Sequence, residues 1–205
     1  MGGSDRRYLI AAGLAVVGAL AMGRGMDGPG EEPHYRDHGG PRALWHIPDG
    51  RALPPSSPAR IEVPGIGVDA PVTRVGLNGD GTVEVPPLRQ AERVGWYEQG
   101  PAPGSRGPAV LLGHYDGTEG PAVFYRLRQV RPGARIRVTR QDRSVAVFQV
   151  DATERVPKWE FPRVRVYGNV RYAGLRLVTC GGEYDEGDRS YQDNLIVYAH
   201  LTGER

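Results

Sequence analysis

The sequence predicts an all-β domain of eight short strands that form a barrel or a sandwich, and two observations indicate this fold class. From residue 59 onward, short runs rich in β-branched residues alternate with Gly and Pro turn signals, a spacing typical of these folds. Glycine and proline contribute 30 and 18 of the 205 residues, which favours a loop-rich β protein over a helical bundle. The eight predicted strands cover residues 59–63, 68–75, 82–85, 109–114, 135–140, 144–154, 175–180 and 194–201.

The first 24 residues have the pattern of an export signal. Arg6 and Arg7 precede an uninterrupted apolar run over residues 8–22, which Arg24 closely follows. As a helix this run spans about 22 Å, short of the ~30 Å hydrocarbon core of a bilayer. A cleaved signal peptide and an uncleaved anchor both fit, since residues 19–21 resemble a cleavage site and flanking arginines can reach the membrane interface. Either interpretation places the rest of the chain outside the cytoplasmic membrane.

Residues 25–58 are expected to be a disordered tether. The stretch from residue 23 to residue 58 holds 14 Gly and Pro in 36 positions. Such a composition cannot bury enough apolar surface to offset the chain entropy lost on ordering. The predicted organisation is therefore a leader over 1–24, a tether over 25–58 and a globular domain over 59–205.

Two segments of this domain favour short helices, and a third favours a loop. The first helical candidate is 89–94. The second is 121–130, in which apolar residues recur at helical spacing and predict an amphipathic face packed on the barrel. Residues 157–173 contain two prolines and alternate weakly, so we expect a long loop with room for one helical turn. Loops of that length inside compact domains are more often functional than idle.

Composition excludes several classes of function. A formal charge of +2 argues against a dedicated nucleic-acid binder, which needs a concentrated basic field. A hydrophobic content of 39% is too low for a polytopic membrane protein. The single cysteine, Cys180, can form no intramolecular disulfide, and no C-x-x-C spacing is present to hold zinc. The sequence suggests no cofactor.

Cys180 is the candidate nucleophile. It ends the apolar run 175–180 and precedes Gly181 and Gly182, which lead us to expect the sulfur at the rim of a strand. An inert buried cysteine is the alternative, because free cysteine packs well as a small hydrophobe. Activation needs an imidazole or guanidinium nearby. His114 also ends a predicted strand beside a glycine, but spacing alone does not decide whether the two strand ends meet.

Five motifs in order along the chain resemble the sortase family, most closely class E/F sortases. The match extends from residue 61 to residue 201, and its G-H-x-D and T-C-G-G elements are specific in combination. The motifs are VGWYEQGPAPG (94–104), GPAVLLGHYDG (107–117), FYRLRQVRPGARIRV (124–138), LRLVTCGG (175–182) and DNLIVYAHL (193–201). The resemblance implies an eight-stranded β-barrel and a membrane-anchored cysteine transpeptidase.

The resemblance also implies roles for individual residues. Cys180 would attack a Thr–Gly-like bond in the LPXTG-type sorting signal of a secreted protein and form a thioester. His114 would be general acid for the leaving amine and then base for the incoming amine. That amine would come from a cell-wall precursor or another acceptor. Thr179 would line the substrate groove, and the loop over 157–173 would shape the pocket. The resemblance implies no cofactor or metal for this chain, since the loop offers only Glu160 to a calcium ion.

One departure from the family pattern concerns the oxyanion. Sortases carry an arginine on the last strand, expected here in a Tyr-Arg-Asp-Asn stretch, but the chain has Gln192 between Tyr191 and Asp193. Glutamine donates a neutral hydrogen bond, and charge-assisted bonds are about twice as strong. Loss of one oxyanion donor costs on the order of 3 kcal/mol. We expect Arg189 or Gln192 to take the role. A weak or inactive barrel that binds sorting signals and a peptide-releasing thiol hydrolase are the alternatives.

Overall fold

The computed structural model describes residues 41, 47 and 50–205. The predicted leader over 1–24 lies outside the described residues, as does most of the predicted tether. Within the described part of the chain, no helix is long and apolar enough to cross a bilayer.

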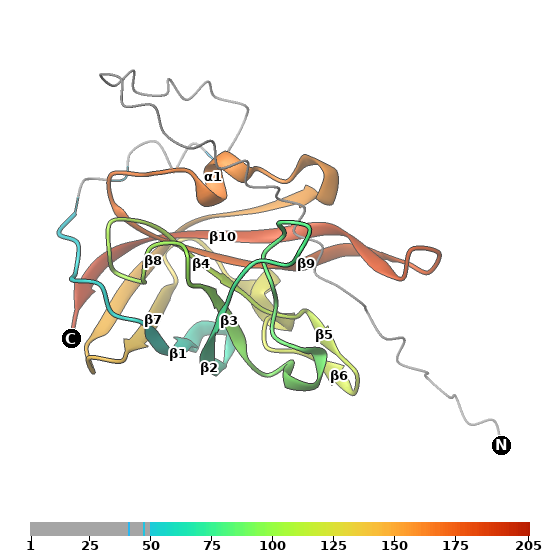
Figure 1. The fold of residues 1–205 in the computed structure, drawn as a ribbon, viewed down its shortest axis with the longest axis horizontal. Helices are drawn as coiled ribbons and strands as arrows, with labels where there is room; N and C mark the ends of the chain where they lie inside the picture. Colours follow the sequence, from blue (N-terminus) through green and yellow to red (C-terminus); the bar gives the residue numbers. More distant parts are fainter. Residues whose placement is uncertain (1–40, 42–46, 48–49) are drawn as a thin grey trace.

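Eight strands close into a barrel in the order β1-β2-β3-β4-β9-β10-β8-β7, which confirms the predicted fold class (Figure 1). Neighbouring strands are antiparallel except for the β2–β3 and β4–β9 pairs, which are parallel. The barrel strands are β1 (Pro58–Val63), β2 (Val68–Val75), β3 (Val94–Tyr97), β4 (Gly107–Leu112), β7 (Arg135–Arg140), β8 (Val145–Pro157), β9 (Ala173–Asp185) and β10 (Ser190–Glu204). A separate two-stranded sheet pairs β5 (Asp116–Gly117) with β6 (Gly120–Pro121).

Seven predicted strands match barrel strands, and the eighth is wrong. Residues 82–85 form no named strand and contribute only the isolated bridge between Leu77 and Val83. The missing barrel strand is β3, whose four residues are all buried. A short strand buried on both faces shows no polar alternation, so its pattern is weak. Gly95 weakens the strand pattern further. A Cβ at this position would lie 2.9 Å from Val75 Cγ1, so the packing requires glycine.

The predicted helices are present only as short 3₁₀ turns. Residues 89–94 split between η3 (Leu88–Gln90) and the start of β3. Within 121–130, η4 covers Tyr125–Gln129, and the buried residues Phe124, Leu127 and Val130 recur every three residues, the period of a 3₁₀ helix. The loop over 157–173 contains η5 (Lys158–Glu160) and the single α-helix of the described chain, α1 (Arg163–Tyr167).

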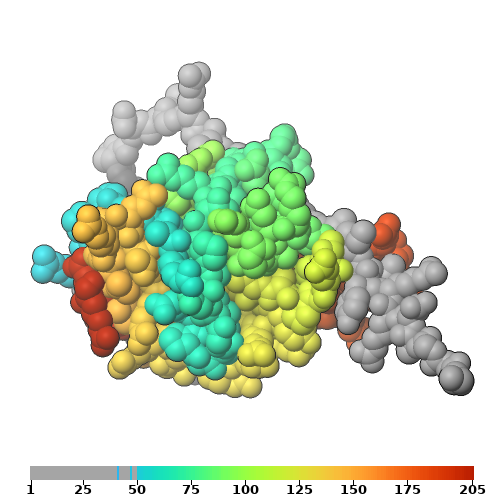
Figure 2. All heavy atoms as spheres, turned by 90° about the horizontal axis from the view of Figure 1, so that it is seen from below, coloured from blue at the N-terminus to red at the C-terminus, as the bar shows by residue number. Residues whose placement is uncertain are grey.

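Alternation along the strands divides the buried side chains into two clusters. The interior cluster fills the barrel and includes Leu175 and Leu177 of β9. The outer cluster lies between the β4–β9–β10–β8 sheet and the segment with α1, and it includes Val178 and Cys180 of the same strand. Figure 1 shows α1 above these strands. Figure 2 shows the opposite face, with β1 and β2 in teal at its centre and β8 in orange beside them.

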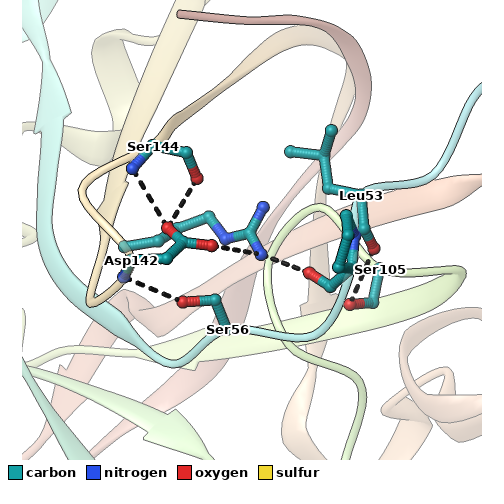
Figure 3. A network of polar contacts seen from close by, with 7 residues as sticks. Leu53, Ser56, Ser105, Asp142 and Ser144 are labelled. Atoms are coloured by element: carbon teal, nitrogen blue, oxygen red, sulfur yellow. Dashed lines mark hydrogen bonds and ion pairs between the residues drawn. The ribbon is translucent and has the colours of Figure 1, made fainter.

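Residues 50–57, which we call the strap, lie against the barrel although the sequence assigns them to the tether. Leu53 is only 7% exposed, and its N–H donates to the Gly104 carbonyl over 2.8 Å. Arg140 is buried, donates to the Pro54 carbonyl and pairs with Asp142 over 3.2 Å. Figure 3 shows this network, in which Ser56 and Ser144 also hold Asp142.

Candidate functional site

Cys180 lies in the middle of β9, not at its end as expected. The strand runs from Ala173 to Asp185, and Cys180 pairs with Asn194 of β10. On the other side, however, the β4–β9 ladder ends with Leu112 opposite Val178 and the Gly113 N–H donating to the Val178 carbonyl over 3.1 Å. The sulfur therefore lies where one edge of β9 loses its partner, which is the rim that the sequence pattern indicates.

The two glycines after Cys180 form a β-bulge rather than a strand end. Asn194 and Asp193 pair with Cys180 and Gly181, but Tyr191 pairs with Tyr184, so β9 has one extra residue opposite Gln192. Gly182 occupies the left-handed region with φ 79°, and a Cβ there would clash with the Asp193 carboxylate. Both facts require glycine at this position. The bulge lets β9 continue into the hairpin beyond the nucleophile.

His114 lies beside Cys180 at the end of the neighbouring strand. His114 lies two residues beyond Leu112, and Cys180 lies two residues beyond Val178, the last pair of the parallel β4–β9 ladder. Leu112 and Val178 belong to the outer cluster. Because side chains two residues apart on a strand point to the same face, His114 and Cys180 lie on the outer face as well. His114 is 7% exposed and Cys180 is 8% exposed. The structure thus brings these two candidates together.

One ring nitrogen of His114 is fixed by the backbone. Nε2 lies 2.6 Å from the Pro86 carbonyl oxygen, which can only accept a hydrogen bond, so Nε2 carries a proton. The His114 carbonyl in turn accepts from the Phe124 N–H over 3.0 Å. In the neutral imidazole, Nδ1 is therefore the nitrogen able to accept a proton.

The surroundings of Cys180 oppose ionisation of the thiol. Burial raises its pKa to about 11, the positive charge of Lys158 lowers this pKa, and the negative charge of Asp116 raises it further. The sulfur is therefore a neutral thiol at neutral pH. Lys158 was not identified from the sequence, although it is the only lysine among 26 basic residues. Its ammonium donates to Ser190 Oγ over 2.5 Å.

Tyrosines connect the segment after His114 to the β9–β10 hairpin. The Tyr191 hydroxyl donates to the Asp116 carboxylate. The Tyr191 ring contacts Tyr115 and Tyr184, with centroids 5.1 and 5.3 Å apart, and Tyr115 contacts Tyr125. Burial and the Asp116 carboxylate both raise the pKa of Tyr191, so it stays a hydrogen-bond donor. This aromatic cluster ties Asp116 to the hairpin near Cys180.

Three further candidates from the sequence do not lie at the level of Cys180 on the outer face. Thr179 is fully buried and follows the interior alternation of Leu175 and Leu177, so its side chain lies inside the barrel, away from the expected groove. Arg189 is exposed at the tip of the hairpin, with φ 50°. It precedes Asn194 by five residues, a distance of roughly 16 Å along a strand. Gln192 is exposed opposite the bulge.

Gln192 takes part in the hairpin turn. The Asp185 carboxylate accepts the backbone N–H groups of Asp188 and Gly187, which lower its pKa, and a bond from Gln192 adds to this effect. The carboxamide expected near the oxyanion therefore has a structural partner. Asn194, which sequence reasoning did not single out, is the amide directly opposite Cys180.

Other potential sites are separate from this one or not formed. A cavity of about 380 Å³ lies between the start of β2 and residues 121–126, with Glu92 and Arg126 in its lining. No group of three His, Cys, Asp or Glu within the described residues could hold a metal ion.

Comparisons with known proteins identify the family. The family model "Sortase domain" matches residues 61–202, and no curated protein matches the chain. Three similar solved structures are the sortase SrtA from Actinomyces oris, sortase A from Listeria monocytogenes and sortase C-1 from A. oris. Their identities are 21%, 17% and 22%, and their TM-scores are 0.57, 0.56 and 0.54. The matches cover 75%, 73% and 71% of this chain and 88%, 90% and 73% of those chains, respectively. The fold is therefore shared with solved sortases, and the match over residues 61–202 means that the chain belongs to the sortase family.

Proposed function

We propose that this protein is a cysteine transpeptidase that cleaves the sorting signal of secreted proteins and transfers the acyl group to an amine of the cell envelope. The observation that supports the proposal is that His114 follows the end of β4 and that Cys180, the only thiol, lies on the neighbouring strand β9 just beyond the end of the β4–β9 ladder. An acid–base group beside a thiol at the rim of a sheet is suited to acyl transfer. Membership of the sortase family supports this reaction class.

The proposed catalytic cycle starts from a protonated Cys180 thiol and a His114 ring whose Nδ1 can accept a proton. The neutral Cys180 thiol gives its proton to His114 as sulfur attacks the peptide carbonyl, and the new C–S bond creates a tetrahedral oxyanion. His114 then protonates the leaving amine, the C–N bond breaks and a thioester remains. An acceptor amine attacks this thioester, His114 takes its proton, and His114 passes that proton to the sulfur as the C–S bond breaks, which restores the thiol.

The substrate is an LPXTG-type sorting signal, and the acceptor is an amine on a cell-wall precursor or another envelope component. The outer cluster that contains Cys180 supports this, because Val166 of α1 belongs to it and Tyr191 of β10 packs against it. We further propose that the apolar run over residues 8–22 anchors the enzyme at the extracytoplasmic face of the membrane, or directs secretion if it is cleaved. Assignment to class E/F rests on the sequence motifs.

The test combines the full chain with a panel of sorting-signal peptides and an acceptor amine, read by mass spectrometry. We expect an acyl adduct on Cys180 and a ligated product. Cys180→Ala should abolish both, and His114→Ala should lower the rate of ligation about a hundredfold or more. Cleavage without ligation would favour a hydrolase, and binding without an adduct would favour an inactive sorting-signal binder. An active Cys180→Ala variant would refute the proposed nucleophile.

Arg189 and Gln192 stay candidates for oxyanion stabilisation until they are tested. Thioester formation should be measured in Arg189→Ala and Gln192→Ala variants with the same peptide. A hundredfold lower rate in one variant would support its role. Normal rates in both would dismiss them.

A further inference from the structure

A buried carboxamide lies directly opposite the nucleophile. Asn194 of β10 pairs with Cys180 in the β9–β10 ladder. Directly opposite residues of antiparallel strands have side chains on one face, with Cβ atoms about 4.5–5.5 Å apart. The alternation of β10 agrees, because Ile196 and Tyr198 pack with Cys180 in the outer cluster. The side chain of Asn194 therefore lies beside that of Cys180.

The amide of Asn194 has no hydrogen-bond partner. Its exposed fraction is 0%, and neither Nδ2 nor Oδ1 has a partner among the described residues. Leaving a buried polar group unpaired costs about 1–3 kcal/mol, and folded proteins contain few such groups. An unpaired donor beside the candidate nucleophile would therefore gain a hydrogen bond from a carbonyl group placed against it.

We propose that Asn194 is the oxyanion donor of the reaction, and this inference rests on the proposed function. When Cys180 Sγ attacks the peptide carbonyl, a C–S bond forms and the carbonyl π electrons move to oxygen. That oxygen is bonded to the carbonyl carbon that Sγ has attacked. It is therefore within reach of the Asn194 side chain, whose Cβ lies about 5 Å from the Cβ of Cys180. The Nδ2–H group donates to the oxyanion, and the charge returns to the carbonyl when the C–N bond breaks.

The decisive variant is Asn194→Leu in the full chain, which keeps the branched shape of the side chain at a larger volume and removes the donor. Acyl-adduct formation with the sorting-signal peptide should fall about a hundredfold. Alkylation of Cys180 by iodoacetamide should stay close to the wild-type rate, because this substitution reaction forms no oxyanion. The melting temperature should be unchanged or higher, since an unpaired buried amide is removed. A peptide aldehyde should also bind the variant more weakly than the wild type, because its adduct with Cys180 carries an oxygen at the oxyanion position.

Two further variants keep the test decisive. Asn194→Ala should give the same separation of acylation from alkylation if the leucine variant does not fold. Asn78→Ala is the control, because its carboxamide already has a partner and donates to Thr82 Oγ1 over 2.8 Å in an exposed turn. It should lower stability slightly and leave acylation unchanged.

Three outcomes would overturn the proposal. The first is wild-type acylation by both Asn194 variants. The second is an equal loss of acylation and alkylation, which would assign Asn194 to formation of the thiolate. The third is a wild-type chain that reacts with iodoacetamide but forms no adduct with any peptide. That result refutes the proposed function itself and is recognised without any variant.

Discussion

At the scale of single residues, the proposed nucleophile Cys180 is held in its protonated, unreactive form. Burial raises its pKa to about 11, with opposing effects of Lys158 and Asp116. Only about one thiol in 10⁴ is then ionised at pH 7. The environment thus protects a lone thiol from oxidation and alkylation, and in the proposed mechanism His114 removes the proton.

This pKa sets the pH dependence of alkylation. Because the thiolate reacts and the thiol does not, the rate of iodoacetamide modification should rise about tenfold per pH unit from pH 7 to pH 10. The measurement is the alkylation rate of Cys180 followed by mass spectrometry, with Cys180→Ala as the blank. A plateau below pH 9 would show that the thiol ionises far more readily than its burial indicates.

The two charges beside the thiol should act in opposite directions. Lys158→Met removes the charge that favours the thiolate, so alkylation at pH 8 should slow by about three- to tenfold. Lys158→Arg keeps the charge and should stay near the wild type. Asp116→Asn removes a charge that raises the pKa while keeping an acceptor for Tyr191, so it should react faster. Equal rates for the methionine and arginine variants would contradict an electrostatic role.

At the scale of elements, the predictable strands are those with a distinctive apolar pattern. β2 and β7 are predicted at their observed bounds because turn signals flank both runs. β3 is missed because VGWY is short and buried on all sides, and residues 82–85 show that β-branched residues alone do not make a barrel strand. Likewise, the spacing of Phe124, Leu127 and Val130 fits both a helix and a 3₁₀ turn.

The outer cluster that contains Cys180 is covered in part by one short helix. Val166 of α1 is fully buried in the outer cluster that contains Cys180, while Val164 of the same helix is 66% exposed. Val166→Ala should destabilise the protein by about 2 kcal/mol through lost burial and a small cavity. It should also speed alkylation of Cys180 at fixed pH, because burial is the main cause of the raised pKa.

Val164→Ala is the matched control for this prediction. It makes the same chemical change on the exposed face of α1 and should alter neither urea unfolding nor the alkylation rate. If both valine variants alkylate like the wild type, α1 does not govern access of water to the sulfur.

At the scale of the whole molecule, the candidate site could be predicted as residue types but not as geometry. Cys180 and His114 are identified by motif, yet their adjacency depends on the parallel β4–β9 register, which no local pattern encodes. Asn194 becomes noticeable only through its pairing with Cys180, and Lys158 only through its charge near the sulfur. Such relations arise from pairing between distant segments.

The strap and the candidate site lie at opposite ends of the barrel. The strap contacts Gly104, before the start of β4, and Arg140, at the β7–β8 turn. His114 follows the end of β4, about 20 Å away along that six-residue strand. Figure 1 accordingly shows the C-terminus at one side and the β9–β10 hairpin at the other. The described chain thus enters the barrel at the end remote from the proposed nucleophile.

This separation predicts that the strap stabilises the fold without tuning the chemistry. Leu53→Ala should cost about 3 kcal/mol, because the side chain is buried, whereas Arg51→Ala on the exposed part of the strap should cost little. Removal of the strap should cost more stability than Leu53→Ala. The comparison is between a chain that begins at residue 58 and one that begins at residue 50. In the shorter chain Arg140 also loses the Pro54 carbonyl while remaining charged and buried. Thermal unfolding measures these differences.

At temperatures where every variant is folded, Cys180 should alkylate at one common rate. A rate that changes with Leu53→Ala would mean that the two ends of the barrel are energetically coupled.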